Sequence, residues 1–167
     1  KTFTADETLD GWRILASPGD IAPSSRTSLP WGRQSEWPIK PEIVMEGGNW
    51  ATDGQNIDRN DDLCLLTTGR NSVFSSLADT SAACAQAARM AAILHTKYPE
   101  LWPESVRALL VHSATWTDGM LAGSAVADLS SGDKIHLMRR FGYGLPRQES
   151  AEFSASNRAC IVIQDIL

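Results

Sequence analysis

Two neighbouring stretches of the chain carry the residue pattern of helices. Residues 81–97 contain no Gly or Pro and are rich in Ala, the strongest helix former, so they predict a helix that Pro99 ends. The stretch WPESVRALLVHSATW predicts a second helix, because Pro103 suits the first helical position and four residues recur at the spacing of one helical face. These four residues are Val106, Leu109, Leu110 and Ser113.

Shorter apolar runs predict strands. Residues 39–45 lie between prolines and a Gly-Gly pair, and residues 63–68 mix β-branched and apolar side chains, so both are expected to be core strands, the first in a parallel sheet. Residues 12–19 predict a short strand, and the alternation in residues 158–167 predicts another. The polar, turn-forming stretch 51–63 and the stretch that leads to Asp79 are expected to be loops. Helices and buried strands together indicate an α/β fold.

The composition is that of one soluble globular domain. The chain has 167 residues, of which 43% are hydrophobic and 21% charged. A formal net charge of -5 with scattered Lys and Arg argues against a nucleic-acid partner. No apolar run reaches the ~18 residues needed to cross a bilayer, so no membrane partner is expected.

Cysteine usage and the first residues bear on location. Cys64, Cys84 and Cys160 are odd in number and widely spaced, which disfavours a disulfide framework and a zinc site. Reduced thiols fit a cytoplasmic protein. The chain starts at Lys1 without a signal-peptide pattern, which indicates an excised piece of a longer protein.

The alanine-rich helix begins with two hydroxyl side chains, Thr80 and Ser81. Small side chains let neighbouring elements pack close to the helix backbone, so we expect the helix to be buried and Ala88→Leu to destabilise the domain by about 1 to 3 kcal/mol. The unpaired N–H groups and the dipole of the first turn would suit an oxyanion that forms beside Ser81. In the alternative interpretation, Thr80 or Ser81 is only an N-cap.

Three ordered motifs resemble one family. TSAACAQAARMAAILHTKYPELWPESVRALLVHSA resembles the segment of subtilisin-like proteases that holds the nucleophilic serine, IKPEIVMEGGN resembles their Lys-Pro-Asp-Ile-Val strand, and FGYGLP resembles their closing Gly-Tyr-Gly segment. The resemblance covers about residues 38–146. It implies a parallel-sheet α/β fold whose buried helix carries Ser81 as the catalytic nucleophile, with Thr80 and Ala82 supporting the oxyanion turn. Residues 1–147 would be the C-terminal part of the peptidase domain, and residues 148–167 a strand-containing extension.

The chain departs from the family pattern in two places. Asp79 stands where the family usually has Gly, and its carboxylate would oppose a nearby oxyanion while it favours the helix N-terminus. Ala85 and Gln86 replace the usual Pro and His, with little expected consequence.

The catalytic partners of Ser81 are not evident in the chain. The family supplies its Asp and its His before the serine, but His95, His112 and His136 all follow Ser81. His95 is 14 residues along the same predicted helix, or about 21 Å, which is beyond hydrogen-bond reach; His112 falls on the second helix and His136 in a predicted loop. The oxyanion-hole Asn of the family also has no counterpart. We therefore expect a C-terminal fragment, inactive alone, whose Asp, His and Asn lie on a missing N-terminal part.

The resemblance predicts a serine endopeptidase that acts on a peptide or protein substrate and needs no cofactor. The alternative is a non-catalytic protein-binding or regulatory module on the same scaffold, for which Asp79 is the main argument. Asp58, Asn60 and Asp62 alternate as in a calcium loop, but Leu63 and Gly69 occupy the positions of its Gly and Glu, so no metal site is predicted here. Family members often carry structural calcium and are usually secreted.

Overall fold

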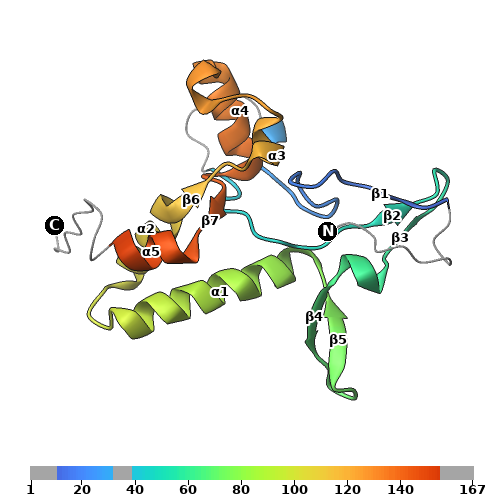
Figure 1. Ribbon diagram of the computed structural model, residues 1–167, viewed down its shortest axis with the longest axis horizontal. Helices are drawn as coiled ribbons and strands as arrows, with labels where there is room; N and C mark the ends of the chain where they lie inside the picture. Colours follow the sequence, from blue (N-terminus) through green and yellow to red (C-terminus); the bar gives the residue numbers. More distant parts are fainter. Residues whose placement is uncertain (1–10, 32–38, 155–167) are drawn as a thin grey trace. The chain divides into compact units, whose positions relative to one another are not determined.

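The computed structural model describes residues 11–31 and 39–154. The chain divides into two compact units, which are described separately: residues 1–26 with 46–85, and residues 27–45 with 86–167. Figure 1 labels the elements of both units. Helices and strands both occur, as an α/β fold requires. Every strand pair among the described residues is antiparallel, however, and none has the parallel neighbours that were expected.

The first unit contains two small sheets. The short strands β1 (Arg13–Ile14), β2 (Ala51–Thr52) and β3 (Ile57–Asp58) form one sheet, in which β2 pairs with both neighbours. The β1 strand confirms the strand predicted in residues 12–19, whereas β2 and β3 lie in a stretch that was predicted to be a loop. Buried Asn49 ties the turn after β1 to β2, because its side-chain amide donates to the Ala16 carbonyl at 2.7 Å and its oxygen accepts from the Ala16 N–H at 3.1 Å.

The second sheet of this unit is a hairpin. Strands β4 (Leu65–Thr68) and β5 (Phe74–Leu77) pair in register, with Leu65 opposite Leu77 and Leu66 opposite Ser76. The strand predicted at residues 63–68 is confirmed as β4, but its predicted position in the core is wrong, since Leu66 is 74% exposed. The prediction of a loop before Asp79 is wrong where β5 forms, and Phe74 of β5 is 62% exposed. The buried residues of the predicted segment are Leu63 and Cys64, which lie before the strand: Leu63 ends the 3-10 turn η3 (Asp61–Leu63) and Cys64 follows it.

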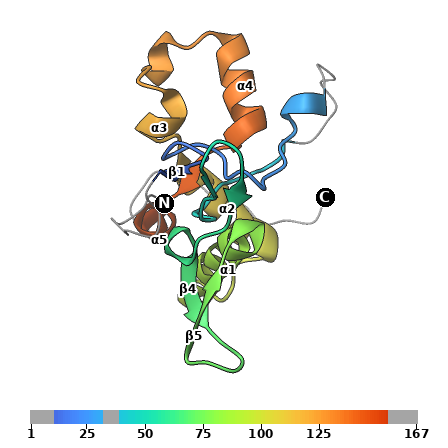
Figure 2. The same ribbon diagram turned by 90° about the vertical axis from the view of Figure 1, so that its right-hand side faces the viewer.

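Helix α1 (Asp79–Lys97) follows the hairpin directly and continues into the second unit (Figure 2). The helix itself is as predicted. Its buried positions among the described residues are Ala82, Met90 and Leu94, whereas Ala85, Ala88 and Ala92 are exposed. The prediction that this helix is buried is therefore wrong, because nine of residues 81–97 are exposed and three are buried.

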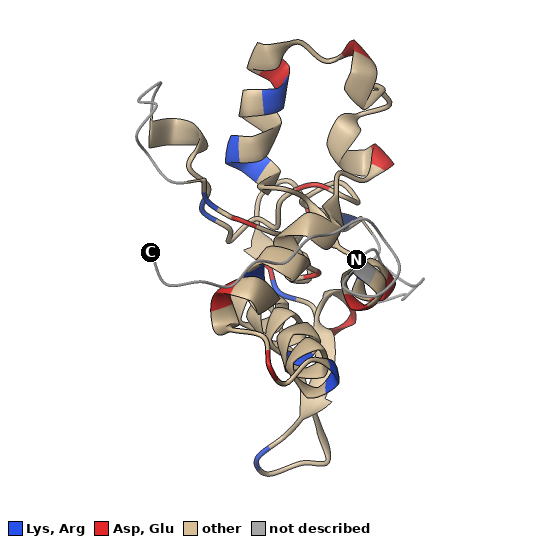
Figure 3. Cartoon of the chain, turned by 90° about the vertical axis from the view of Figure 1, so that its left-hand side faces the viewer, with Lys and Arg blue, Asp and Glu red and all other residues tan. Residues whose placement is uncertain are grey.

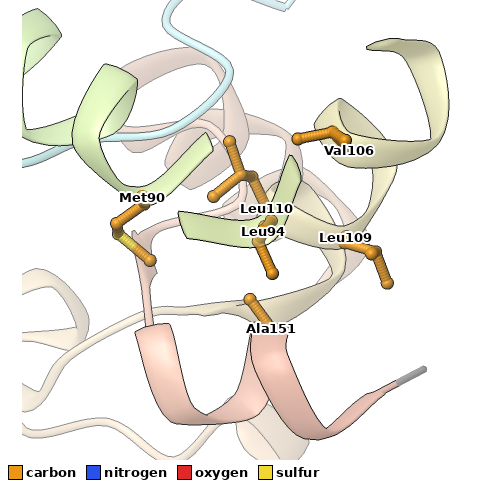
Figure 4. Packing of buried hydrophobic residues seen from close by; sticks show 6 residues of the cluster. All are labelled: Met90, Leu94, Val106, Leu109, Leu110 and Ala151. Atoms are coloured by element: carbon orange, nitrogen blue, oxygen red, sulfur yellow. The ribbon is translucent and has the colours of Figure 1, made fainter. Parts of the chain in front are cut away.

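The second unit has a hydrophobic core made by three helices. Helix α2 (Pro103–Ser113) buries the four residues predicted from its spacing, and helix α5 (Gln148–Ser154) lies beside it. Figure 4 shows how the core side chains point toward one another. The cluster consists of Met90, Leu94, Val106, Leu109, Leu110 and Ala151.

Residues 39–45 belong to this unit but form no strand, so that prediction is wrong. Their backbone forms isolated hydrogen bonds instead: the Val44 N–H donates to the Gly144 carbonyl at 3.0 Å, and the Tyr143 N–H donates to the Glu42 carbonyl at 2.8 Å. The Lys40 carbonyl also accepts from the Ser28 N–H at 2.7 Å. Arg107 of α2 adds a two-pronged ion pair with the Glu42 carboxylate, which raises the pKa of this guanidinium. The segment is thus held beside α2 by polar contacts instead of a strand ladder.

A mostly helical segment separates α2 from the FGYG motif. After β6 (Ala114–Thr115) come α3 (Asp118–Leu121), η4 (Val126–Asp128) and α4 (Ser131–Phe141), and the chain then returns as β7 (Leu145–Pro146), which pairs with β6. Ser130 and Asp133 form a capping box that starts α4. Figure 3 shows acidic and basic residues on α4, with Asp133 in its first turn and Arg139 and Arg140 in its last. His136 lies on α4, so its predicted loop position is wrong. The predicted strand 158–167 lies outside the described residues.

Candidate active site

The candidate nucleophile lies at the start of α1, just after the β5 strand. Ser81 is exposed in the first turn of the helix, and no hydrogen bond involves its hydroxyl group among residues 11–31 and 39–154. Thr80 is also exposed, whereas Ala82 is 1% exposed and anchors the turn to the interior. First-turn N–H groups have no partner within a helix, so the Ser81 N–H can donate to a developing oxyanion.

The backbone that leads to Ser81 is fixed by a close approach of two segments. Asp79 has a φ of +66°, and its N–H donates to the Gly47 carbonyl at 2.7 Å. A Cβ at Gly47 would lie 3.1 Å from the Asp79 carbonyl oxygen, and a Cβ at Gly48 would lie 2.6 Å from the Leu63 carbonyl oxygen. Gly48 also has a φ of +81°. Because Gly47 and Gly48 carry no Cβ, residues 46–49 lie close enough to the backbone of Asp79 and Leu63 to hold the turn before α1 in place.

The Asp79 side chain is held at both of its oxygens. Its Oδ1 accepts from the Ser24 hydroxyl at 2.5 Å, and its Oδ2 forms an ion pair with the Arg59 guanidinium. That guanidinium lies over the Trp50 ring, 5.4 Å from the ring centroid. The sequence drew attention to Asp79 as a departure from Gly, but no spacing signal pointed to Ser24 or Arg59, which are 55 and 20 residues away in the chain.

The three histidines are exposed on helices of the second unit. His95 is on α1, where it lies 14 positions after Ser81, which corresponds to about 21 Å along the continuous helix. His112 is in the last turn of α2, and His136 is on α4. The helix α1 therefore does not bring an imidazole next to Ser81.

The acidic stretch before β4 has structural contacts. The Asn60 side chain accepts from the Asp62 N–H and caps η3, while Asp61 accepts from the Ser76 hydroxyl at 2.6 Å. In the part of the chain that the structure describes, no three His, Cys, Asp or Glu side chains gather as metal ligands would. Cys64 is buried and Cys84 is exposed, and neither forms a disulfide within the described residues. None of the described helices combines the length and apolar character that a membrane crossing demands.

Comparison with known proteins assigns the chain to a family. The model of the subtilase family, Peptidase_S8, matches residues 4–144, which include the Asp79 turn, both long helices and the FGYG motif. No curated protein and no solved structure matches the chain. Because the family match covers most of the sequence, the chain belongs to the subtilase family.

Proposed function

We propose that the chain supplies the nucleophile of a subtilisin-type serine endopeptidase, and that this nucleophile is Ser81. The observation that carries the proposal is the exposed hydroxyl of Ser81 on the first turn of α1, inside the family match; this hydroxyl has no hydrogen-bond partner in the part of the chain that the structure describes. A serine at this place combines a reachable oxygen with backbone N–H groups that can donate to an oxyanion.

The proposed reaction has two halves. A histidine takes the proton of Ser81 as Oγ attacks the peptide carbonyl carbon, the carbonyl oxygen becomes an oxyanion, and the C–N bond breaks as the histidine protonates the leaving amine. Water then attacks the acyl-enzyme with the same histidine as base, which releases the acid and restores Ser81. In this chain, the Ser81 N–H would donate to the oxyanion in both halves.

We propose that the histidine and its carboxylate partner come from a polypeptide segment outside residues 1–167. His95 is too far along α1, and all three histidines follow Ser81, whereas the family places its His before the serine. The exposed face of α1 supports this proposal, because its small residues recur at the spacing of one helical face, as expected for a surface that another element covers closely. These residues are Ser81, Cys84, Ala85, Ala88 and Ala92.

A fluorophosphonate probe tests the proposal, because its phosphorus bonds to Oγ only when a base removes the serine proton and fluoride leaves. We expect no labelling of the 167-residue chain alone. Labelling should appear when the chain is joined to, or mixed with, the remaining part of the peptidase polypeptide. Ser81→Ala should abolish it, while His95→Ala and His112→Ala should retain it. Labelling that survives Ser81→Ala would overturn the assignment of the nucleophile.

The exposed thiol of Cys84 gives a second measurement, one turn after Ser81 on the same face of α1. In a Cys160→Ser background, alkylation of Cys84 should slow when the complementing part binds, because that part covers the helix face. Buried Cys64 serves as the internal control. Unchanged alkylation of Cys84 in a complex that labels at Ser81 would show that this face stays open.

A further inference from the structure

Asp79 places a negative charge two residues before the proposed nucleophile. Its two carboxylate oxygens are occupied by different partners, the Ser24 hydroxyl and the Arg59 guanidinium, which come from separate segments of the first unit. The positive φ of Asp79 is unfavourable for a residue with a Cβ, although Asp tolerates it better than most. The side-chain contacts therefore oppose any local rearrangement of this turn.

An unpaired carboxylate at this position would act against catalysis. The transition state of acyl transfer develops negative charge next to the first-turn N–H groups. A single charge roughly 8 Å away, at an effective dielectric constant of about 20 to 40, changes a rate by about 5- to 30-fold. A cation paired with Asp79 would remove most of this penalty.

Arg59 is placed to supply that cation. It reaches Asp79 across 20 residues of sequence, and the Trp50 ring lies beneath its guanidinium at 5.4 Å. Contact with the aromatic face restricts where the long side chain goes, so the charge stays beside Asp79 although 56% of the side chain is exposed.

We propose that Arg59 is a positioning residue for Ser81: its ion pair with Asp79 neutralises this carboxylate and holds it off the helix N-terminus, so that the Ser81 N–H serves the oxyanion unopposed. The inference rests on the proposed function of Ser81. Asp79 stands where the family usually has Gly. Its ion pair with Arg59 would make this replacement compatible with catalysis.

The test uses the full peptidase polypeptide and measures the rate of fluorophosphonate labelling at Ser81. Arg59→Met should slow labelling by about 5- to 30-fold, because it leaves the Asp79 charge unpaired. Asp79→Asn should stay within about threefold of wild type, and the double variant Arg59→Met/Asp79→Asn should match Asp79→Asn. This rescue is a sign of charge compensation that a merely structural role of Arg59 would not give.

Salt provides an independent measurement. The loss of labelling rate caused by Arg59→Met should become smaller as ionic strength rises from about 0.01 M to about 1 M. The reason is that the Debye screening length falls from about 30 Å to about 3 Å. Arg59→Lys keeps the charge and should restore most of the rate. Arg13→Met, which removes an exposed arginine from β1 of the same unit, is the matched control and should label at the wild-type rate.

The outcomes separate the two proposals. If the wild-type polypeptide is not labelled at Ser81, the proposed function fails and the role of Arg59 fails with it. If wild type is labelled but Arg59→Met is labelled equally fast, or if the double variant remains as slow as Arg59→Met, only the role of Arg59 is overturned. Thermal unfolding of each variant confirms that the fold is retained, as expected for a substitution at an exposed side chain.

Discussion

The two halves of helix α1 are held in different ways. The second half packs Met90 and Leu94 against α2 and α5, where side chains fill a continuous apolar core. The first half is held at its start by backbone pairing of Asp79 with Gly47 and by polar contacts of the Asp79 carboxylate. Apolar packing sets the position of the helix, whereas backbone geometry and charge set the position of Ser81. Substitutions in the two halves should therefore affect different measurements.

The largest loss of stability is expected in the apolar core against which the second half of α1 packs. Leu109 is 1% exposed and lies in the core of the second unit, so Leu109→Ala should lower the free energy of unfolding by about 2 to 5 kcal/mol. Urea unfolding of the 167-residue chain measures this loss of free energy. A loss under about 1 kcal/mol would mean that α2 is not packed as described.

The backbone support of the site should be almost as sensitive. Gly48→Ala would place a Cβ 2.6 Å from the Leu63 carbonyl oxygen at a positive φ, so we expect a loss of about 2 to 4 kcal/mol. Gly54 is the matched control, because its φ is +96° but nothing lies within 4 Å of an added Cβ. Gly54→Ala should lose only about 1 to 2 kcal/mol. Equal losses at the two positions would show that the approach of Gly48 to Leu63 is not close.

The sequence predicted well what α2 contributes to this core. The spacing of Val106, Leu109, Leu110 and Ser113 gave the buried face of α2, because one helix periodicity fixes which side chains share a face. The same reasoning failed for the alanine stretch. Ala is compatible with a buried face and with an exposed one, so composition alone does not show which face of α1 is covered.

The support of the candidate site was less predictable. Motif resemblance pointed to Ser81 and to the unusual Asp79, but the contacts of Asp79 with Ser24 and Arg59 join segments far apart in the chain. Local patterns carry no information on such pairs. The strand prediction for residues 39–45 failed for a related reason: their composition is strand-like, yet their backbone forms isolated hydrogen bonds with Ser28 and with the returning FGYG segment and no strand ladder.

Ala88 distinguishes the chain alone from the proposed complete peptidase. Because Ala88 is exposed, Ala88→Leu should change the free energy of unfolding of the 167-residue chain by no more than about 0.5 kcal/mol. In the complete peptidase the added side chain should disturb the covered face by about 1 to 3 kcal/mol and weaken assembly, which Ser81 labelling detects. Unchanged labelling with Ala88→Leu would mean that nothing packs against this face.

The conformation of Asp79 should give an effect of about 1 kcal/mol. Asp79→Gly and Asp79→Ala both remove the carboxylate, but only Gly adopts a φ of +66° without strain. We therefore expect Asp79→Gly to be the more stable of the two by about 1 to 2 kcal/mol in thermal unfolding. Equal stability would show that the turn before Ser81 relaxes to a negative φ.

The smallest effect concerns pH and the turn between β2 and β3. The N–H and the side-chain amide of Asn56, with the Gln55 N–H, hydrogen-bond the Asp53 carboxylate and lower its pKa from 3.8 to about 2. Because the folded state binds the proton more weakly than the unfolded chain, ionised Asp53 stabilises the fold above about pH 4, and this contribution is lost as the pH falls toward 2. Asp53→Asn should therefore reduce the drop in melting temperature between pH 5 and pH 2, by a small amount because the carboxylate is exposed. A drop as steep as that of wild type would show that other carboxylates alone set the acid sensitivity.

Combined with Asp79→Asn, the Asp53→Asn substitution should give additive changes in melting temperature. In the described residues, no contact joins the β2–β3 turn to the turn before Ser81.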